Sequence, residues 1–350
     1  MPMFAACLLL AFMSVFSAAP AGAADQELSL FIWSEYLPEE VVSAFSRETG
    51  IKVTVATYDS NEAMRAALKQ DKNKNRYDLI VPSSDYVGLL AAEGLLQPLN
   101  HNQVPLLAGI DRKFLDKGFD PGNTYSVPYL WGSTIIVVNT RLVGAGTVNT
   151  LADLWKPELR GKLLLPNDPR EVLGLGLEAI GYSINEKDPG RLAAAYNKVK
   201  KLMPAVKLFD SDSPKEKLLS GEAAVGVMWS GEAFIVGNED PDIHIIYPSE
   251  GFILWVDSLC IPKNATHVEA AHRFINYLLE PEVAAAISME TGYSTPNSKA
   301  MTYIDPGVRN NPVVYPLTSD LARGEFLENI GEQAMNLYNE YWRKLREEQK

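Results

Sequence analysis

The sequence contains few of the residues from which metal sites and nucleophilic centres are built. It has 2 cysteines and 4 histidines in 350 residues, and the histidines are too scattered for metal-ligand spacing. G-x-S-x-G, phosphate-loop and C-x-x-C motifs are absent, and residues 174–179 match G-x-G-x-x-A only inside an expected helix, where a dinucleotide motif does not belong. We therefore expect no enzyme activity, no cofactor and no metal.

Basic residues are in deficit as well. The chain has 32 Lys and Arg against 44 Asp and Glu, a formal net charge of −12. Nucleic acid repels a protein of this charge, so we expect no nucleic-acid partner, whereas a cationic ligand is compatible with it.

One long apolar run occurs, at the beginning of the chain. Residues 4–19 are nearly all apolar and small residues follow at 21–24, so residues 1–24 are typical of a cleavable secretory signal peptide, although no Lys or Arg precedes the run. The run is too short to span a membrane. Cys7 would leave with the signal, and Cys260 then stands alone in an apolar stretch, which predicts a buried free thiol. These features predict a soluble protein of the bacterial periplasm.

The chain is longer than one typical domain and is 47% hydrophobic, which predicts two lobes, each with its own core. Short apolar strands alternate with amphipathic helices, a pattern that predicts parallel sheets covered by helices. The expected strands are 28–32, 51–56, 77–81, 162–165, 206–209, 223–229 and 243–247. The expected helices are 38–50, 61–70, 166–181, 188–202, 213–220, 268–279, 281–291 and 326–345. Two long extended segments, 125–139 and 251–262, are interpreted as crossovers between the lobes.

Asp257 lies in the middle of the apolar segment 251–262. A buried carboxylate needs a partner, because leaving it unpaired costs several kcal/mol. The partner is either internal, such as an Arg or backbone N–H groups, or a cation from outside. Trp255 shares the strand face of Asp257, and an aromatic face beside a carboxylate suits an organic ammonium group.

The same combination of aromatic and carboxylate recurs at expected strand ends. Each aromatic alone is more often a core residue, and each loop acid is often merely solvated. Together, the carboxylates can bind ammonium groups while the rings stack on methylene chains, as a flexible aliphatic polycation requires. The pairs are Trp33 with Glu35, Tyr86 with Asp85, Trp229 with Glu232, and Trp255 with Asp257.

Asp168 and Glu171 are three residues apart at the start of an expected helix. One interpretation is a helix cap followed by an acid in the first turn, worth about 1 kcal/mol to the helix. A glycosidase acid–base pair is a second interpretation, but two acids on one helical turn are poorly placed to flank a bond.

Eight ordered segments, spread over nearly the whole mature chain, resemble the periplasmic spermidine/putrescine-binding proteins of bacterial polyamine ABC importers. They are WSEY at 33–36, ETGIKV at 48–53, YDLIVPS at 77–83, SVPYLWG at 126–132, ADLWKP at 152–157, DPREV at 168–172, WVDSL at 255–259 and GYSTPN at 292–297. The resemblance implies an α/β fold of the class II periplasmic binding protein type, with a ligand cleft between two lobes. It implies an N-terminal lobe of 25–133 plus 256–302 and a C-terminal lobe of 134–255 plus 303–350.

The resemblance also implies a function and a set of ligand contacts. It implies a monomeric receptor that captures spermidine or putrescine by lobe closure and delivers it to an inner-membrane ABC permease. With their neighbours, the candidate ligand-binding residues are Trp33, Ser34, Glu35, Tyr36, Ser83, Asp85, Tyr86, Asp168, Glu171, Trp229, Glu232, Trp255, Asp257 and Tyr293.

Three positions depart from the spermidine-type pattern. Asp85 stands where an aromatic residue is usual, Leu327 where Gln is usual, and Glu232 where a small polar residue is usual. An acid at the position of Glu232 is more similar to putrescine-type members. The choice between spermidine and putrescine therefore stays open.

Two other functions also stay open at this stage. A binding protein of the same fold for a basic amino acid would need a cation for the ligand carboxylate, and Arg170 is the one Arg in the candidate site segments. A secreted carbohydrate hydrolase would use Glu35, Asp168 or Asp257. The sequence has no feature for or against a signalling or adhesion role.

Overall fold

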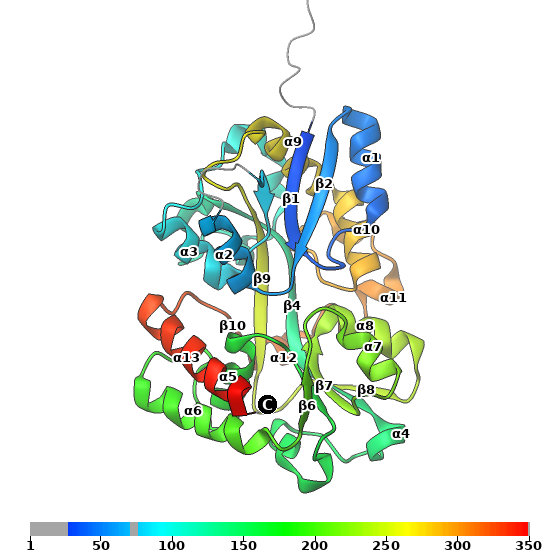
Figure 1. The fold of residues 1–350 in the computed structure, drawn as a ribbon. Coiled ribbons are helices and arrows are strands. Elements are labelled where there is room, and N and C mark those ends of the chain that lie inside the picture. The colour runs from blue at the N-terminus through cyan, green and yellow to red at the C-terminus, as the bar shows by residue number, and fades with distance from the viewer. Residues whose placement is uncertain (1–26, 71–75, 349–350) are drawn as a thin grey trace, which may run out of the picture.

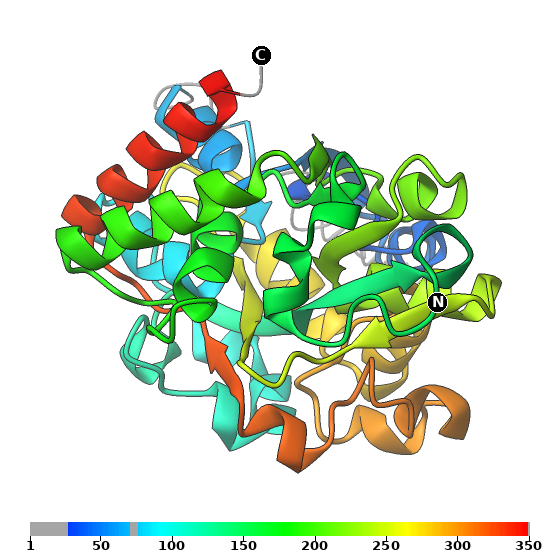
Figure 2. The same cartoon turned by 90° about the horizontal axis from the view of Figure 1, so that it is seen from below.

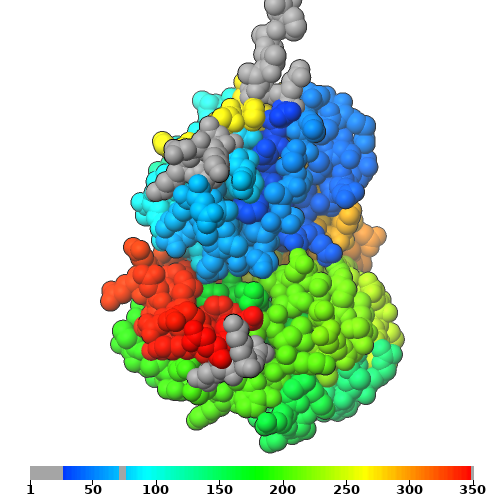
Figure 3. All heavy atoms as spheres, viewed as in Figure 1, coloured from blue at the N-terminus to red at the C-terminus, as the bar shows by residue number. Residues whose placement is uncertain are grey.

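The computed structural model describes residues 27–70 and 76–348, which form two lobes stacked one above the other (Figures 1 and 3). The expected two-lobed α/β fold is confirmed. The expected signal peptide, residues 1–24, and Cys7 lie outside the described residues. Cys260 is a buried free thiol.

The first lobe contains the beginning of the chain. Strand β1 pairs in parallel with β2 on one side and β3 on the other, as the alternating pattern predicts. Its strands are β1 (Glu27–Trp33), β2 (Lys52–Tyr58) and β3 (Leu79–Ile80). Its helices are α1 (Glu39–Thr49), α2 (Asn61–Gln70), α3 (Ser84–Ala92), α9 (Val268–Leu278) and α10 (Pro281–Thr291), and the short α11 (Pro306–Arg309) lies beside α10 (Figure 1).

The second lobe repeats this arrangement. Strand β5 pairs in parallel with β6 and with β7. The strands are β5 (Leu163–Leu165), β6 (Val206–Phe209), β7 (Val225–Trp229), β8 (Ile243–Ile246) and β10 (Gly324–Phe326). The helices are α4 (Thr140–Val143), α5 (Pro169–Glu178), α6 (Pro189–Leu202), α7 (Pro214–Leu219), α8 (Ser230–Glu239), α12 (Thr318–Leu321) and α13 (Glu332–Glu348).

Two antiparallel strands join the lobes. Strands β4 (Ser126–Asn139) and β9 (Phe252–Cys260) run side by side through both lobes, and every residue in them is buried (Figure 1). They occupy the centre of one continuous sheet with the order β2-β1-β3-β9-β4-β7-β5-β6. Both expected crossover segments are therefore crossovers, and Asp257 lies on the second of them.

Helix α1 shows how local sequence sets an element. It follows Pro38, carries Glu39 and Glu40 in its first turn, and ends at Gly50 in the left-handed conformation (φ 74°). Acids at the positive end of the helix dipole favour the start of a helix, and a glycine in the left-handed conformation just after the last helical residue is a common stop signal.

The expected helices differ from the structure at three places. Helix α3, which begins at Ser84, and helix α8, which follows β7, are both absent from the expected set. The last helix begins at Glu332 rather than near Phe326, because 324–326 instead form β10, which pairs in parallel with β9. That pairing is distant in sequence, so local periodicity carries no sign of it.

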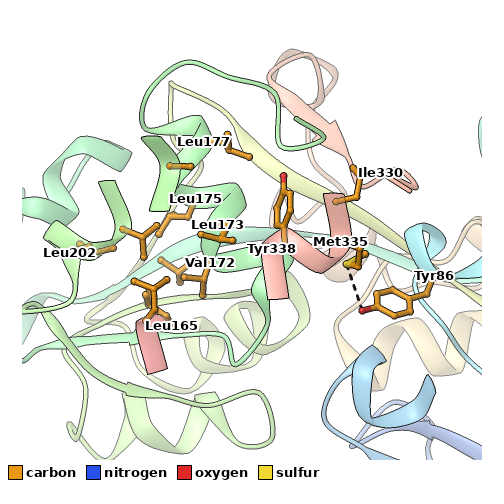
Figure 4. Packing of buried hydrophobic residues seen from close by; sticks show 14 of the residues in the cluster. Tyr86, Leu165, Val172, Leu173, Leu175, Leu177, Leu202, Ile330, Met335 and Tyr338 are labelled. Carbon is orange, nitrogen blue, oxygen red and sulfur yellow. Dashed lines mark hydrogen bonds between the residues drawn. The ribbon is translucent and has the colours of Figure 1, made fainter. Parts of the chain in front are cut away.

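Helix α13 anchors the end of the chain to the second lobe. Figure 4 shows Tyr338 of α13 on the side toward Leu173 of α5, and the red α13 lies beside the green α6 when seen from below (Figure 2). The Tyr338 hydroxyl donates a hydrogen bond to the carbonyl of Ile184 (3.0 Å).

The segment that contains α11 packs against α10. Ile304 packs in a small apolar cluster with Ala284 and Ala285 of α10, and Val308 packs against that cluster. The division of the lobes at 302/303 stays a prediction.

Candidate ligand-binding cleft

A cavity lies between the two lobes, where strands from both end. It holds about 670 Å³ of space free of protein atoms, counting the part open to solvent. Its lining residues are Trp33, Ser34, Tyr36, Asn61, Ser83, Asp85, Asp168, Arg170, Glu171, Ser211, Asp212, Pro214, Trp229, Glu232, Trp255, Asp257, Tyr293 and Leu327. The lining includes every candidate ligand residue except Glu35 and Tyr86.

The fold brings these residues together in a regular way. Trp33 ends β1 and Trp229 ends β7, so each lobe contributes the carboxyl end of a parallel strand, the usual ligand position in such sheets. Glu171 lies in the first turn of α5, and Trp255 and Asp257 come from the crossover β9.

Asp257 is 5% exposed, and only one of its two carboxylate oxygens has a hydrogen-bond partner. Its Oδ2 accepts a hydrogen bond from the Tyr36 hydroxyl (2.7 Å), whereas its buried Oδ1 has no hydrogen-bond partner. Burial raises the pKa of Asp257 to about 7, although the nearby Ser83 side chain and the hydrogen bond from Tyr36 oppose the shift. No cation within the described residues pairs with this carboxyl group.

Glu171 also has one carboxylate oxygen with hydrogen-bond partners and one without. Its Oε1 accepts hydrogen bonds from the Thr134 hydroxyl (3.0 Å) and the Trp229 indole (3.2 Å), and its buried Oε2 has no partner. Burial, reinforced by the charge of Asp168, raises the pKa of Glu171 to about 8. Its side chain lies in the first turn of α5 and also lines the cavity.

Asp168 performs the capping role that its position predicts. Its Oδ1 accepts hydrogen bonds from the backbone N–H groups of Arg170 (2.7 Å) and Glu171 (3.0 Å). It also lines the cavity. Burial raises its pKa even so, against the effect of these hydrogen bonds.

The predicted site residue Asp85 already has an internal partner. Arg170 Nη1 lies 3.2 Å from Asp85 Oδ2, and both side chains are 2% exposed. Arg170 also donates to the Glu328 carbonyl (3.1 Å) and to Asn185 Oδ1 (2.8 Å). Burial raises the pKa of Asp85 to about 6 despite the guanidinium, and its Oδ1 has no hydrogen-bond partner.

Glu232 and Glu35 meet a second internal cation, Lys215. Burial raises the pKa of Glu232 to about 7, with Lys215 opposing the shift, and Lys215 Nζ lies 4.0 Å from Glu232 Oε2. Glu35 forms a close ion pair with Lys215, and the Glu35 side chain is 54% exposed. Glu35 lines an outer groove rather than the cavity.

Aromatic rings from both lobes wall the cavity. The rings of Trp33 and Trp229 approach edge to face across the cleft, with centroids 5.9 Å apart. Tyr293 meets Trp255 (5.3 Å) and Tyr36 (5.2 Å) in the same manner.

Tyr86 points away from the cavity. Its hydroxyl donates to Glu62 and lies 3.9 Å from Met335 Sδ, the contact drawn in Figure 4. It therefore connects α3 of the first lobe with α13 of the second, and its ligand role stays a prediction that the cavity geometry does not favour.

Four further residues line the cavity that no sequence pattern singled out: Asn61, Ser211, Asp212 and Pro214. Residues 211–214 follow β6 at its carboxyl end, so the strand-end rule could have found them. Asn61 holds Ser83 through two hydrogen bonds of 3.1 Å, a pairing that local sequence does not reveal.

Within residues 27–70 and 76–348, no group of three or more His, Cys, Asp or Glu is arranged to hold a metal ion, and no helix is long and apolar enough to cross a membrane.

Comparisons with known proteins agree with this architecture. Residues 40–314 match the family described as bacterial extracellular solute-binding protein. The spermidine/putrescine-binding periplasmic protein of Escherichia coli K12 is 43% identical over 328 residues, covering 93% of this chain and 94% of that protein. The putrescine-binding periplasmic protein PotF of the same organism is 31% identical, and the match covers 84% of each chain. A solved structure, a putative spermidine/putrescine ABC transporter from Listeria monocytogenes, is 36% identical with a TM-score of 0.88, covering 92% of this chain and 99% of that one.

Proposed function

Because this chain belongs to the family of bacterial extracellular solute-binding proteins, we propose that it captures a polyamine, spermidine or putrescine, in the cleft between its lobes. The proposed contacts are the candidate residues that line the cavity. The carboxylates bind ammonium groups, and the rings of Trp33, Trp229, Trp255 and Tyr293 cover the methylene chain.

One observation carries the proposal. Asp257, Glu171 and Glu232 each present a buried carboxylate oxygen without a hydrogen-bond partner in a single aromatic-walled cavity. Such oxygens are costly to bury, and alkylammonium groups, which are strong donors with a full positive charge, satisfy them directly.

The relatives support the role that follows capture. They are described as periplasmic binding proteins, and the similar solved structure as a putative spermidine/putrescine ABC transporter. We infer that this protein acts in the periplasm, closes its lobes about the β4 and β9 crossovers, and delivers the ligand to an inner-membrane ABC permease without chemical change. Neither the sequence motifs nor the cavity supplies an activated nucleophile.

A basic amino acid fits the cavity less well. Its carboxylate would need a cation, and Arg170 is the one Lys or Arg among the described lining residues. Arg170 is already committed to Asp85. An α-carboxylate would therefore face Asp257 and Glu171 with no charge to balance it.

Calorimetry of ligand-stripped protein tests the proposal. The protein is unfolded in denaturant, dialysed, refolded, checked for a cooperative thermal transition, and titrated with spermidine, putrescine, lysine and arginine. We expect tight binding of at least one polyamine and none of either amino acid at the same concentrations. Folded protein that binds neither polyamine would contradict the proposed function.

A further inference from the structure

Lys215 lies where the cleft opens outward. It is the second residue of α7 in the second lobe, and its side chain is 17% exposed. Its ammonium group pairs with Glu35 of the first lobe and lies 4.0 Å from Glu232 Oε2 of its own lobe. A cation of the protein thus bridges two acids at the edge of the cavity.

The cavity and the outer groove meet at this point. They share Trp33, Tyr36 and Glu232 as lining residues, whereas Lys215 and Glu35 line only the groove. A ligand chain leaving the cavity past Glu232 would reach the position that Lys215 Nζ occupies.

The surroundings of Lys215 favour its protonated, charged form. Partial burial works against the charged form, but the hydrogen bond to Glu35 and the negative charge of Glu232 outweigh it, so the pKa of Lys215 rises. An alkylammonium group is also what a polyamine would present to the same two acids.

Resting on the proposed polyamine function, we propose that Lys215 is a specificity-determining residue that substitutes for one ammonium group of the ligand at Glu35 and Glu232, and thereby selects a diamine over a triamine. Asp257 and Glu171 then bind the two ammonium groups of a diamine. A triamine enters only by displacing Lys215 or by placing its third charge beside it, and two like charges at that distance repel.

The arrangement in the other half of the cavity is consistent with this role. Arg170 neutralises Asp85 there, as Lys215 neutralises Glu35 at the mouth. Of the cavity carboxylates that keep an unpaired oxygen, Asp257 and Glu171 have no Lys or Arg salt-bridge partner among the described residues.

Titration of the Lys215→Met variant with putrescine and with spermidine tests the proposal, because methionine keeps much of the side-chain length and removes the charge. The readout is the ratio of the Kd values for putrescine and spermidine, measured by calorimetry on stripped, refolded protein. We expect the wild type to bind putrescine at least as tightly as spermidine. In Lys215→Met the ratio of the putrescine Kd to the spermidine Kd should rise by at least about five-fold, which is the scale of one partly exposed charge pair.

Two variants control the measurement. Lys217→Met removes a charge from the same helix, where Lys217 pairs with Glu222, and should keep the wild-type ratio. Lys215→Arg keeps the charge and should also keep the preference for the diamine. Lys215→Gln serves as a second neutral variant and is judged by the same threshold if Lys215→Met does not fold.

The outcomes separate the two proposals. A shift smaller than about five-fold in the neutral variant, or an equal shift in Lys217→Met or Lys215→Arg, would overturn the role of Lys215 while the proposed function stands. Wild-type protein that binds neither polyamine would overturn the proposed function itself.

Discussion

The Tyr36 hydroxyl and Asp257 form a hydrogen bond of 2.7 Å that fixes one carboxylate oxygen and leaves the other unpaired. Tyr36 comes from the segment after β1, and Asp257 from the crossover β9. The bond orients the carboxylate without neutralising it. Burial therefore still disfavours the charged form, and a cation is needed to stabilise it.

Binding should depend on pH and should release protons. The pKa values of Asp257 and Glu232 are raised to about 7 and that of Glu171 to about 8, in each case chiefly by burial. These carboxyl groups are therefore partly protonated at neutral pH, whereas alkylammonium ligands bind their ionised forms. Affinity should rise from pH 6 to pH 8.5, and on the order of one to two protons should leave per ligand at pH 7.

Calorimetry in buffers of different ionisation enthalpy measures that release. The apparent binding enthalpy should change with the buffer in the direction of proton release. An enthalpy that is the same in all buffers, with an affinity independent of pH, would contradict the protonation states derived from burial.

Gly132 should be required for the position of Trp255. A Cβ atom at Gly132 would lie 2.6 Å from Cζ2 of Trp255 and 2.7 Å from the Ser230 hydroxyl, closer than real atoms approach. Gly132→Ala should displace the indole, lower stability by about 1–3 kcal/mol, and weaken polyamine binding by about ten-fold. Gly118→Ala, which has open space at the Cβ position, is the matched control for both the melting temperature and Kd. Equal behaviour of the two variants would show that Trp255 does not depend on this contact.

Arg170 should contribute far more to stability than a surface arginine does. Arg170→Ala leaves the buried Asp85 without its cation and removes the hydrogen bond to Asn185, a change that costs about 3–5 kcal/mol in other buried pairs. Arg141 pairs with Asp240 and Asp242 at 57% exposure, so Arg141→Ala should cost about 0–1 kcal/mol. Denaturant unfolding of the two variants measures the difference, and similar losses would refute the special role of the buried pair.

Much of the fold could be predicted because its elements are local. The helix at α1, the parallel strands and both crossovers follow from apolar periodicity, proline and glycine. Helix α3 was missed because Pro82 and the polar residues after it are typical of a loop. Strand β10 was missed because its partner β9 lies about 70 residues earlier, and only three-dimensional packing brings them together.

The site was harder to predict where charges pair across the lobes. Asp257 and Trp255 could be singled out because a carboxylate is exceptional within an apolar strand. The internal cations could not be assigned, because Lys215 meets Glu35 across 180 positions and Arg170 meets Asp85 across 85. Recurrence of aromatic and acid residues identified the strand ends but could not show that Tyr86 turns toward Met335.

The most direct test is titration of stripped wild-type and Asp257→Asn protein with spermidine and putrescine. Asparagine keeps the size of the side chain and removes its charge, so affinity for both ligands should fall by about 2–5 kcal/mol. Glu178→Gln is the control, because Glu178 is a partly buried acid whose pKa burial also raises to about 8, and it lies outside the cavity lining. A loss confined to Asp257→Asn is the predicted result. Binding by Asp257→Asn within about 1 kcal/mol of the wild type would contradict a cation site at Asp257.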